Sequence, residues 1–141
     1  MLQEAGRHRD ARLVAERVVG IDPTYPNAHG TLGAMLIGEG ALDAAVGHLK
    51  AAVAIDPGDA LARTNLGLAL ARQGQADAAA AQYREALRID PNFVDAHVYL
   101  AELLAAQGSI AEARTHLEIA LKLQPGAVDI RAAYDRITRP N

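Results

Sequence analysis

Cysteine and tryptophan are absent from this sequence, and aromatic residues are scarce, with four tyrosines and one phenylalanine among 141 residues. Without cysteine the chain has no disulfide framework and no thiol chemistry. Half of the residues are hydrophobic, and most of these are alanine or leucine. Because small side chains let helices approach closely, this composition favours packed helices over a core of bulky side chains.

An excess of positive charge and a long apolar run are also missing. The formal net charge is −3, so no basic stripe indicates nucleic acid or an anionic membrane as a partner. No run of 18 apolar residues occurs, and Arg7, Arg9 and Asp10 interrupt the N-terminal segment, so neither a membrane span nor a signal peptide fits. We therefore expect a cytoplasmic chain, of one domain's length, that contacts no nucleic acid and no membrane.

What the sequence does contain is a repeat. Three residue types recur every 34 residues, as prolines at Pro23, Pro57, Pro91 and Pro125, glycines at Gly6, Gly40, Gly74 and Gly108, and alanines at Ala11, Ala45, Ala79 and Ala113. Registers that agree over four copies without an insertion indicate an array of stacked structural units.

Each recurring residue has a physical role in a helical hairpin. Glycine just past a helix adopts the left-handed conformation that closes the last turn, and proline ends a helix because it donates no hydrogen bond. We therefore place Gly40, Gly74 and Gly108 between the two helices of a repeat, and the prolines between repeats. Spacing of i, i+4 and i+7 predicts one buried face in each second helix: Ala45, Leu49 and Ala52; Ala79, Tyr83 and Ala86; Ala113, Leu117 and Ala120.

These signals predict eight helices and no strand, at 8–20, 26–38, 42–55, 60–73, 76–89, 94–107, 110–123 and 127–138. They form a single domain with a partial repeat at 1–25, full repeats at 26–59, 60–93 and 94–127, and a capping helix within 128–141. Residues 1–5 match only the tail of a preceding helix. Helix 8–20 therefore lacks most of its hairpin partner, which leaves Leu13, Val14 or Val18 under-covered.

The period of 34 and the motifs within it resemble the tetratricopeptide repeat family. The family's Leu-Gly pair falls at Leu32-Gly33, Leu66-Gly67 and Leu100-Ala101, and its Ala-x3-aromatic pair is filled by Ala45/Leu49, Ala79/Tyr83 and Ala113/Leu117. Departures are the absent tryptophan and the leucines Leu36, Leu70 and Leu104 where tyrosine is usual. The resemblance covers essentially the whole chain and implies an all-α right-handed solenoid of stacked antiparallel helix pairs.

The resemblance further implies that the first helix of each pair lines a concave groove, in which protein or peptide partners lie. Helical projection predicts that this groove presents Asn27, Gly30, Thr31, Ala34, Ile37, Leu61, Thr64, Asn65, Leu68, Arg72, Asp95, Val98, Tyr99 and Glu102. Several of these are too apolar for a surface without a partner, and the amide of Asn65 suits the backbone of an extended peptide. The family's carboxylate clamp of Lys, Asn, Asn, Lys and Arg is absent, since those places hold Gly30, Ala34, Asn65, Asp95 and Tyr99.

The sequence gives little support for catalysis, for a cofactor or for a metal site. No nucleophile elbow, P-loop or HExxH motif occurs, and no pair of carboxylates is placed for acid–base work. His29 and His97 share one register and His48 and His116 another, so repetition explains them. His29 and His48 could meet across one hairpin, but two ligands make a poor metal site.

We therefore expect a protein–protein interaction scaffold that is not an enzyme and needs no cofactor. Two alternatives stay open. The chain could be a regulatory or substrate-presenting segment of a larger enzyme, such as a glycosyltransferase or sulfotransferase. It could also be an assembly subunit that self-associates through its uncapped N-terminal edge.

Overall fold

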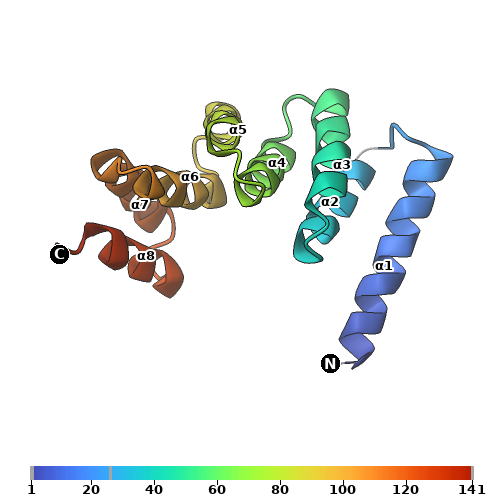
Figure 1. Ribbon diagram of the computed structural model, residues 1–141, viewed down its shortest axis with the longest axis horizontal. Coiled ribbons are helices and arrows are strands. Elements are labelled where there is room, and N and C mark those ends of the chain that lie inside the picture. The colour runs from blue at the N-terminus through green and yellow to red at the C-terminus, as the bar shows by residue number, and fades with distance from the viewer. Residues whose placement is uncertain (1, 26, 141) are drawn as a thin grey trace.

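The computed structural model describes residues 2–25 and 27–140, and this part of the chain contains eight α-helices and no strand. The helices follow one another side by side along the long axis of the molecule (Figure 1). Their bounds are α1 Leu2–Ile21, α2 Ala28–Gly38, α3 Leu42–Ile55, α4 Ala60–Arg72, α5 Ala76–Ile89, α6 Val94–Ala106, α7 Ile110–Leu123 and α8 Val128–Thr138. None of these helices is long and apolar enough to cross a membrane.

The predicted bounds are confirmed for α3, α5 and α7 and differ by one residue at α4, α6 and α8. The first two helices differ more. The first helix was predicted at 8–20 but begins at Leu2, so Gly6 lies inside it. Open space surrounds Gly6, because among the described helices α1 contacts α2 alone. The second was predicted to begin at residue 26. It begins at Ala28 because Asn27 has a left-handed backbone, with φ 68°, which no helix can include.

Glycine ends the first helix of each complete pair, as predicted. Gly40, Gly74 and Gly108 have φ of 77°, 80° and 85°, a region in which a Cβ atom would be strained. The residue after each glycine donates to a carbonyl five residues back, for example Gln75 N to Leu70 O at 2.9 Å. This pair of features is the Schellman motif, and it turns the chain directly into the second helix.

Aspartate and proline shape the connections between pairs. Asp22, Asp56 and Asp90 each precede a proline, and each carboxylate accepts a backbone N–H two residues further along the chain. Such an Asx turn gives the connection a fixed shape without a regular helix or strand. Successive helix pairs are therefore joined in a similar way at three of the four connections.

The core runs along the array between the two helices of each pair. The predicted buried faces of α3, α5 and α7 are confirmed, and Tyr83, Leu49 and Leu117 are among the largest fully buried side chains. They lie against the Leu-Gly positions of the preceding helix. A Cβ atom at Gly33 would lie 2.5 Å from Leu49, and one at Gly67 would lie 2.6 Å from the ring of Tyr83. Glycine at these places therefore sets how closely the helices approach.

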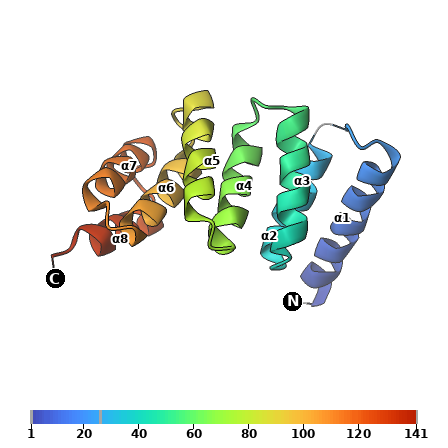
Figure 2. The ribbon, with the colours of Figure 1, turned by 45° about the horizontal axis from the view of Figure 1, so that its top comes forward.

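The array curves toward the even-numbered helices. Close backbone contacts link α2 to α4, α4 to α6 and α6 to α8, whereas no two of α1, α3, α5 and α7 bring their backbones so close within the described chain. Figure 2 shows the same arrangement, with the helices stacked as a bent row. Because the layer whose members touch is the more tightly spaced, α2, α4, α6 and α8 form the concave side.

Candidate functional site

A cleft of about 300 Å³ opens on the concave side between α2 and α4. Its lining is mostly apolar, with Leu61 54% exposed at its edge, and amide and carboxylate groups border it. The lining residues are Asn27, Gly30, Thr31, Ala34, Met35, Asp59, Leu61, Ala62 and Asn65. An apolar side chain would fit here, with polar groups nearby to meet a peptide backbone.

Two further clefts, of about 240 and 460 Å³, adjoin this one, and Asn27 lines all three. α2 begins at Ala28, and Asn27 directly precedes it. Asn27 occupies the N-cap position, yet its side chain makes no capping hydrogen bond. Its amide therefore does not cap α2, and a strained backbone at such a place is frequent in binding sites.

The α6 part of the concave side is more polar. Tyr99 is half-buried, and its ring centre lies 6.0 Å from that of buried Tyr83. Burial raises the pKa of Tyr99, and the carboxylates of Asp95 and Glu102 raise it further, so its hydroxyl stays protonated. Arg72 donates a hydrogen bond to the carbonyl of Ile37 at 3.3 Å and so ties α4 to the end of α2.

Most of the predicted groove residues reach the surface. Seven are exposed, namely Asn27, Thr31, Ala34, Leu61, Arg72, Asp95 and Glu102, and five are half-buried, namely Gly30, Asn65, Leu68, Val98 and Tyr99. Six of them line the α2–α4 cleft, which are Asn27, Gly30, Thr31, Ala34, Leu61 and Asn65. Leu68 and Val98 pack against the core with much of their surface.

Two predicted groove residues, Ile37 and Thr64, are corrected by the structure. Ile37 is 5% exposed and Thr64 is 1% exposed, and the hydroxyl of Thr64 donates to the carbonyl of Ala60 at 2.8 Å. The projection treated each helix alone, but α2 and α4 contact each other, so side chains on the side facing the neighbouring helix are covered. Neither residue presents a surface to a partner.

Tyr25, Met35, Asp59 and Ala62 also line the clefts, although no sequence pattern had assigned them to the groove. A signal for Asp59 existed, since aspartate directly before a helix is a preferred N-cap. Its carboxylate does accept the backbone N–H of Ala62, at 2.9 Å. Tyr25 lies outside the 34-residue pattern, and it is 53% exposed.

Four of the five histidines form two pairs. The Nδ1 atoms of His29 and His48 are 3.1 Å apart, and those of His97 and His116 are 3.0 Å apart. His97 Nε2 lies 2.7 Å from the carbonyl oxygen of Pro91, so it carries the hydrogen, and His97 Nδ1 then accepts from His116. Among residues 2–25 and 27–140, no group of three or more histidine, aspartate or glutamate side chains could hold a metal ion.

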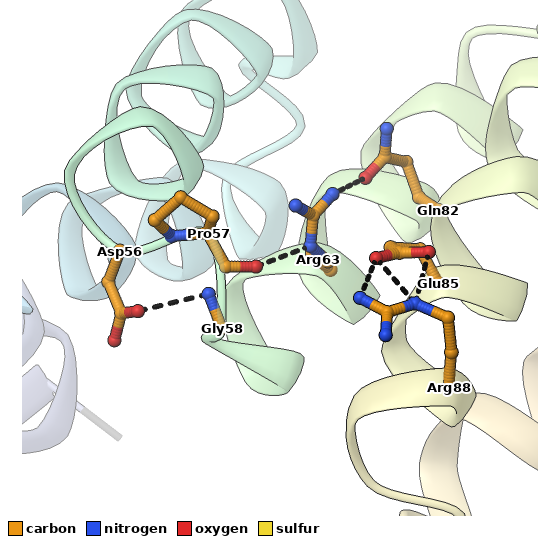
Figure 3. A network of polar contacts seen from close by, with 7 residues as sticks. All are labelled: Asp56, Pro57, Gly58, Arg63, Gln82, Glu85 and Arg88. Carbon is orange, nitrogen blue, oxygen red and sulfur yellow. Dashed lines mark hydrogen bonds and ion pairs between the residues drawn. The ribbon is translucent and has the colours of Figure 1, made fainter.

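The middle repeat, residues 60–93, makes the equivalent contacts with an arginine and a glutamine in place of the two histidines. Arg63 and Gln82 stand 34 residues from the members of each histidine pair. Arg63 Nε donates to the carbonyl of Pro57 at 2.9 Å, and its Nη1 donates to Gln82 at 3.3 Å (Figure 3). All three repeats therefore tie the connecting proline to the second helix at this position, and two of them do so through titratable rings.

We predict that acid weakens the two histidine repeats. Burial lowers the pKa of His48 and of His116, and the paired histidines lower it further, while Glu16 and Glu112 oppose the shift and Arg84 adds to it at His116. The unfolded chain thus binds protons more readily, so stability falls as the pH drops through the ordinary histidine pKa of about 6.5 and below. Urea midpoints should decrease from about pH 7.5 to about pH 5.5.

The control variant replaces the four paired histidines with the arginine and glutamine found at the equivalent places of the middle repeat, as His29→Arg/His48→Gln with His97→Arg/His116→Gln. This variant should lose most of the pH dependence, because arginine and glutamine do not titrate in that range. An equal decrease in the variant and the unaltered chain would show that the histidine pairs do not cause it.

Comparison with known families agrees with this geometry. Two family models, both described as tetratricopeptide repeat, match residues 61–128 and residues 2–66 and 36–82 respectively. Together the matches span residues 2–128, and the chain belongs to the tetratricopeptide repeat family. None of the curated proteins matches the sequence significantly.

Solved structures share the fold over most of the chain. MamA is 21% identical, with a TM-score of 0.83 over 96% of this chain and 79% of MamA. TTC0263, a thermophilic TPR protein of Thermus thermophilus, is 25% identical, with a TM-score of 0.81 over 96% of this chain and 75% of that one. The first TPR of Spaghetti (RPAP3), bound to the HSP90 peptide SRMEEVD, is 19% identical, with a TM-score of 0.75 over 79% and 88% of the two chains.

Proposed function

We propose that this chain is a protein–protein interaction scaffold that binds an extended segment of a partner along its concave side. The α2–α4 cleft is the observation that carries the proposal. It combines exposed apolar surface at Leu61 and Ala34 with the amides of Asn27 and Asn65. An extended peptide needs both, since its side chains seek apolar contact and its backbone seeks donors and acceptors.

Fold neighbours support a peptide as the ligand. The first TPR of Spaghetti was solved with the HSP90 peptide SRMEEVD bound, and the second TPR domain of human RPAP3 with the HSP70 peptide SGPTIEEVD. The present chain should select other peptides, because Asp95 puts a carboxylate where the family's carboxylate clamp has a lysine. We therefore assign the concave side to peptide binding without that clamp.

A photo-crosslinking amino acid placed at Thr31 tests this assignment. Thr31 is exposed and lines two of the clefts, so a crosslinker there should capture a partner protein from the cell of origin. The same crosslinker at Arg84, which is exposed on α5, is the control and should capture little. Capture at Arg84 but not at Thr31 would move the binding surface away from the concave side.

Self-association is a second candidate, favoured by apolar side chains on α1. Leu13 and Val14 are 47% and 61% exposed, as the sequence analysis anticipated for a helix without a full hairpin partner. If two copies associate through α1, light scattering should give a dimer or larger species that Leu13→Glu/Val14→Glu converts to a monomer. A monomer at all concentrations would exclude this candidate and leave the peptide-binding proposal untouched.

A further inference from the structure

Resting on the proposed function, we infer that the bound segment carries a lysine or arginine two positions from an apolar residue. The basic side chain occupies the cleft of about 240 Å³ bordered by Tyr25, Asp56 and Asp59. The apolar side chain occupies the neighbouring α2–α4 cleft beside Leu61.

Two carboxylates give the first cleft its charge. Asp56 and Asp59 both line it, and no lysine or arginine does. His29 also lines it, but its two ring nitrogens lie within hydrogen-bond distance of His48 and of the carbonyl of Pro23. One oxygen of each carboxylate accepts a backbone N–H, from Gly58 at 3.0 Å and from Ala62 at 2.9 Å. Neither aspartate belongs to an ion pair within the described part of the chain, so their charge is available to a cation.

The nearest arginine on α4 does not supply that cation. Arg63 donates to the carbonyl of Pro57 and to the side chain of Gln82, which directs its guanidinium toward α5. Figure 3 shows Asp56 on one side of Pro57 and Arg63 on the other. The cleft therefore keeps a net negative charge that a partner's cation would neutralise.

The rest of this lining suits the long stem of a basic side chain. Ile55 is 40% exposed and Tyr25 is 53% exposed, and the buried Ala52 also lines the cleft. Lysine and arginine place their methylene groups on apolar surface while the charged head stays near anions or water. An aromatic ring such as that of Tyr25 attracts the cation further.

The spacing of the two anchors follows from the shared lining. Asn27, Gly30 and Asp59 line both clefts, so the clefts are immediate neighbours. In an extended segment, side chains two positions apart point to the same side and are about 6.6 Å apart. A basic and an apolar residue separated by one other residue can therefore enter both clefts together.

The test is selection from a library of random octapeptides with acetylated and amidated ends, which removes terminal charges, on the immobilised full chain. We expect retained peptides to be enriched in lysine or arginine two positions from leucine, isoleucine, valine or methionine. The most enriched peptide should bind the Asp56→Asn/Asp59→Asn variant at least about tenfold more weakly, because two charge-assisted contacts are lost. Asparagine keeps the oxygen that accepts the Gly58 and Ala62 N–H groups, so the turn and the helix cap persist.

Asp90→Asn is the matched control. Asp90 makes the same turn one repeat later, by accepting the N–H of Asn92, and lies outside both clefts. It should leave the affinity unchanged. Retained peptides without a basic preference, or with equal affinity for the double variant, would overturn the inference and leave the proposed function standing. Retention of no peptide at all would overturn both.

Discussion

Replacing Gly67 with alanine should lower the free energy of unfolding by up to about 2 kcal/mol. The new Cβ atom would lie 2.6 Å from the ring of Tyr83, which is 1% exposed and has no room to move aside. Overpacking a core typically costs about 1–3 kcal/mol, and the roughly 1 kcal/mol that alanine gains over glycine within a helix offsets only part of that cost at so close a contact. Urea unfolding followed by circular dichroism measures the difference.

The chain supplies both the rescue and the control for this change. Ala101 and Leu117, both fully buried, fill the same two places one repeat later, so Tyr83→Leu should recover part of the stability lost in Gly67→Ala. Gly47 lies in α3 with open space around it, and Gly47→Ala should stabilise by up to about 1 kcal/mol. If Gly67→Ala also stabilises the protein, α4 and α5 do not approach as closely as described.

Repetition explains why so much of the fold could be predicted from the sequence. Gly40, Gly74 and Gly108 all have the left-handed backbone that their spacing predicted, and each alanine-rich face is buried. These features depend on neighbours within one hairpin, which the 34-residue period shows directly. The start of α2 was missed because it depends on the backbone of Asn27, which has no counterpart in the other repeats.

The candidate site could be predicted only in part, because it is made between repeats. Asn27, Thr31, Leu61 and Asn65 were assigned to the concave side from the family resemblance together with helical projection, and all four line the α2–α4 cleft. Thr64 looked equally suitable, yet contact between α2 and α4 covers it. Tyr25 and Asp59 belong to the connections between helices, whose course no helical period predicts, so the sequence did not place them in the clefts.

The second large effect concerns binding. Leu61→Glu should weaken the affinity for a captured partner by more than tenfold, because it puts a charge where an apolar side chain would be desolvated. Asn65→Ala should weaken it by about 1–3 kcal/mol, since a backbone group of the bound segment is left without a hydrogen-bond partner. The fold should tolerate both changes, because Leu61 is 54% exposed and Asn65 is half-buried. Thermal unfolding curves of the two variants check this.

Calorimetric titration of the captured partner segment into the unaltered chain, Leu61→Glu, Asn65→Ala and Arg84→Ala tests the concave-side proposal most directly. Arg84 is the control because it lies on α5, outside the concave side, and its guanidinium faces Glu112 on α7 at 3.4 Å. We predict that both concave-side variants lose affinity while Arg84→Ala binds as the unaltered chain does. Loss of affinity in Arg84→Ala, with full affinity in the other two, would contradict the proposal that partners bind along the concave side.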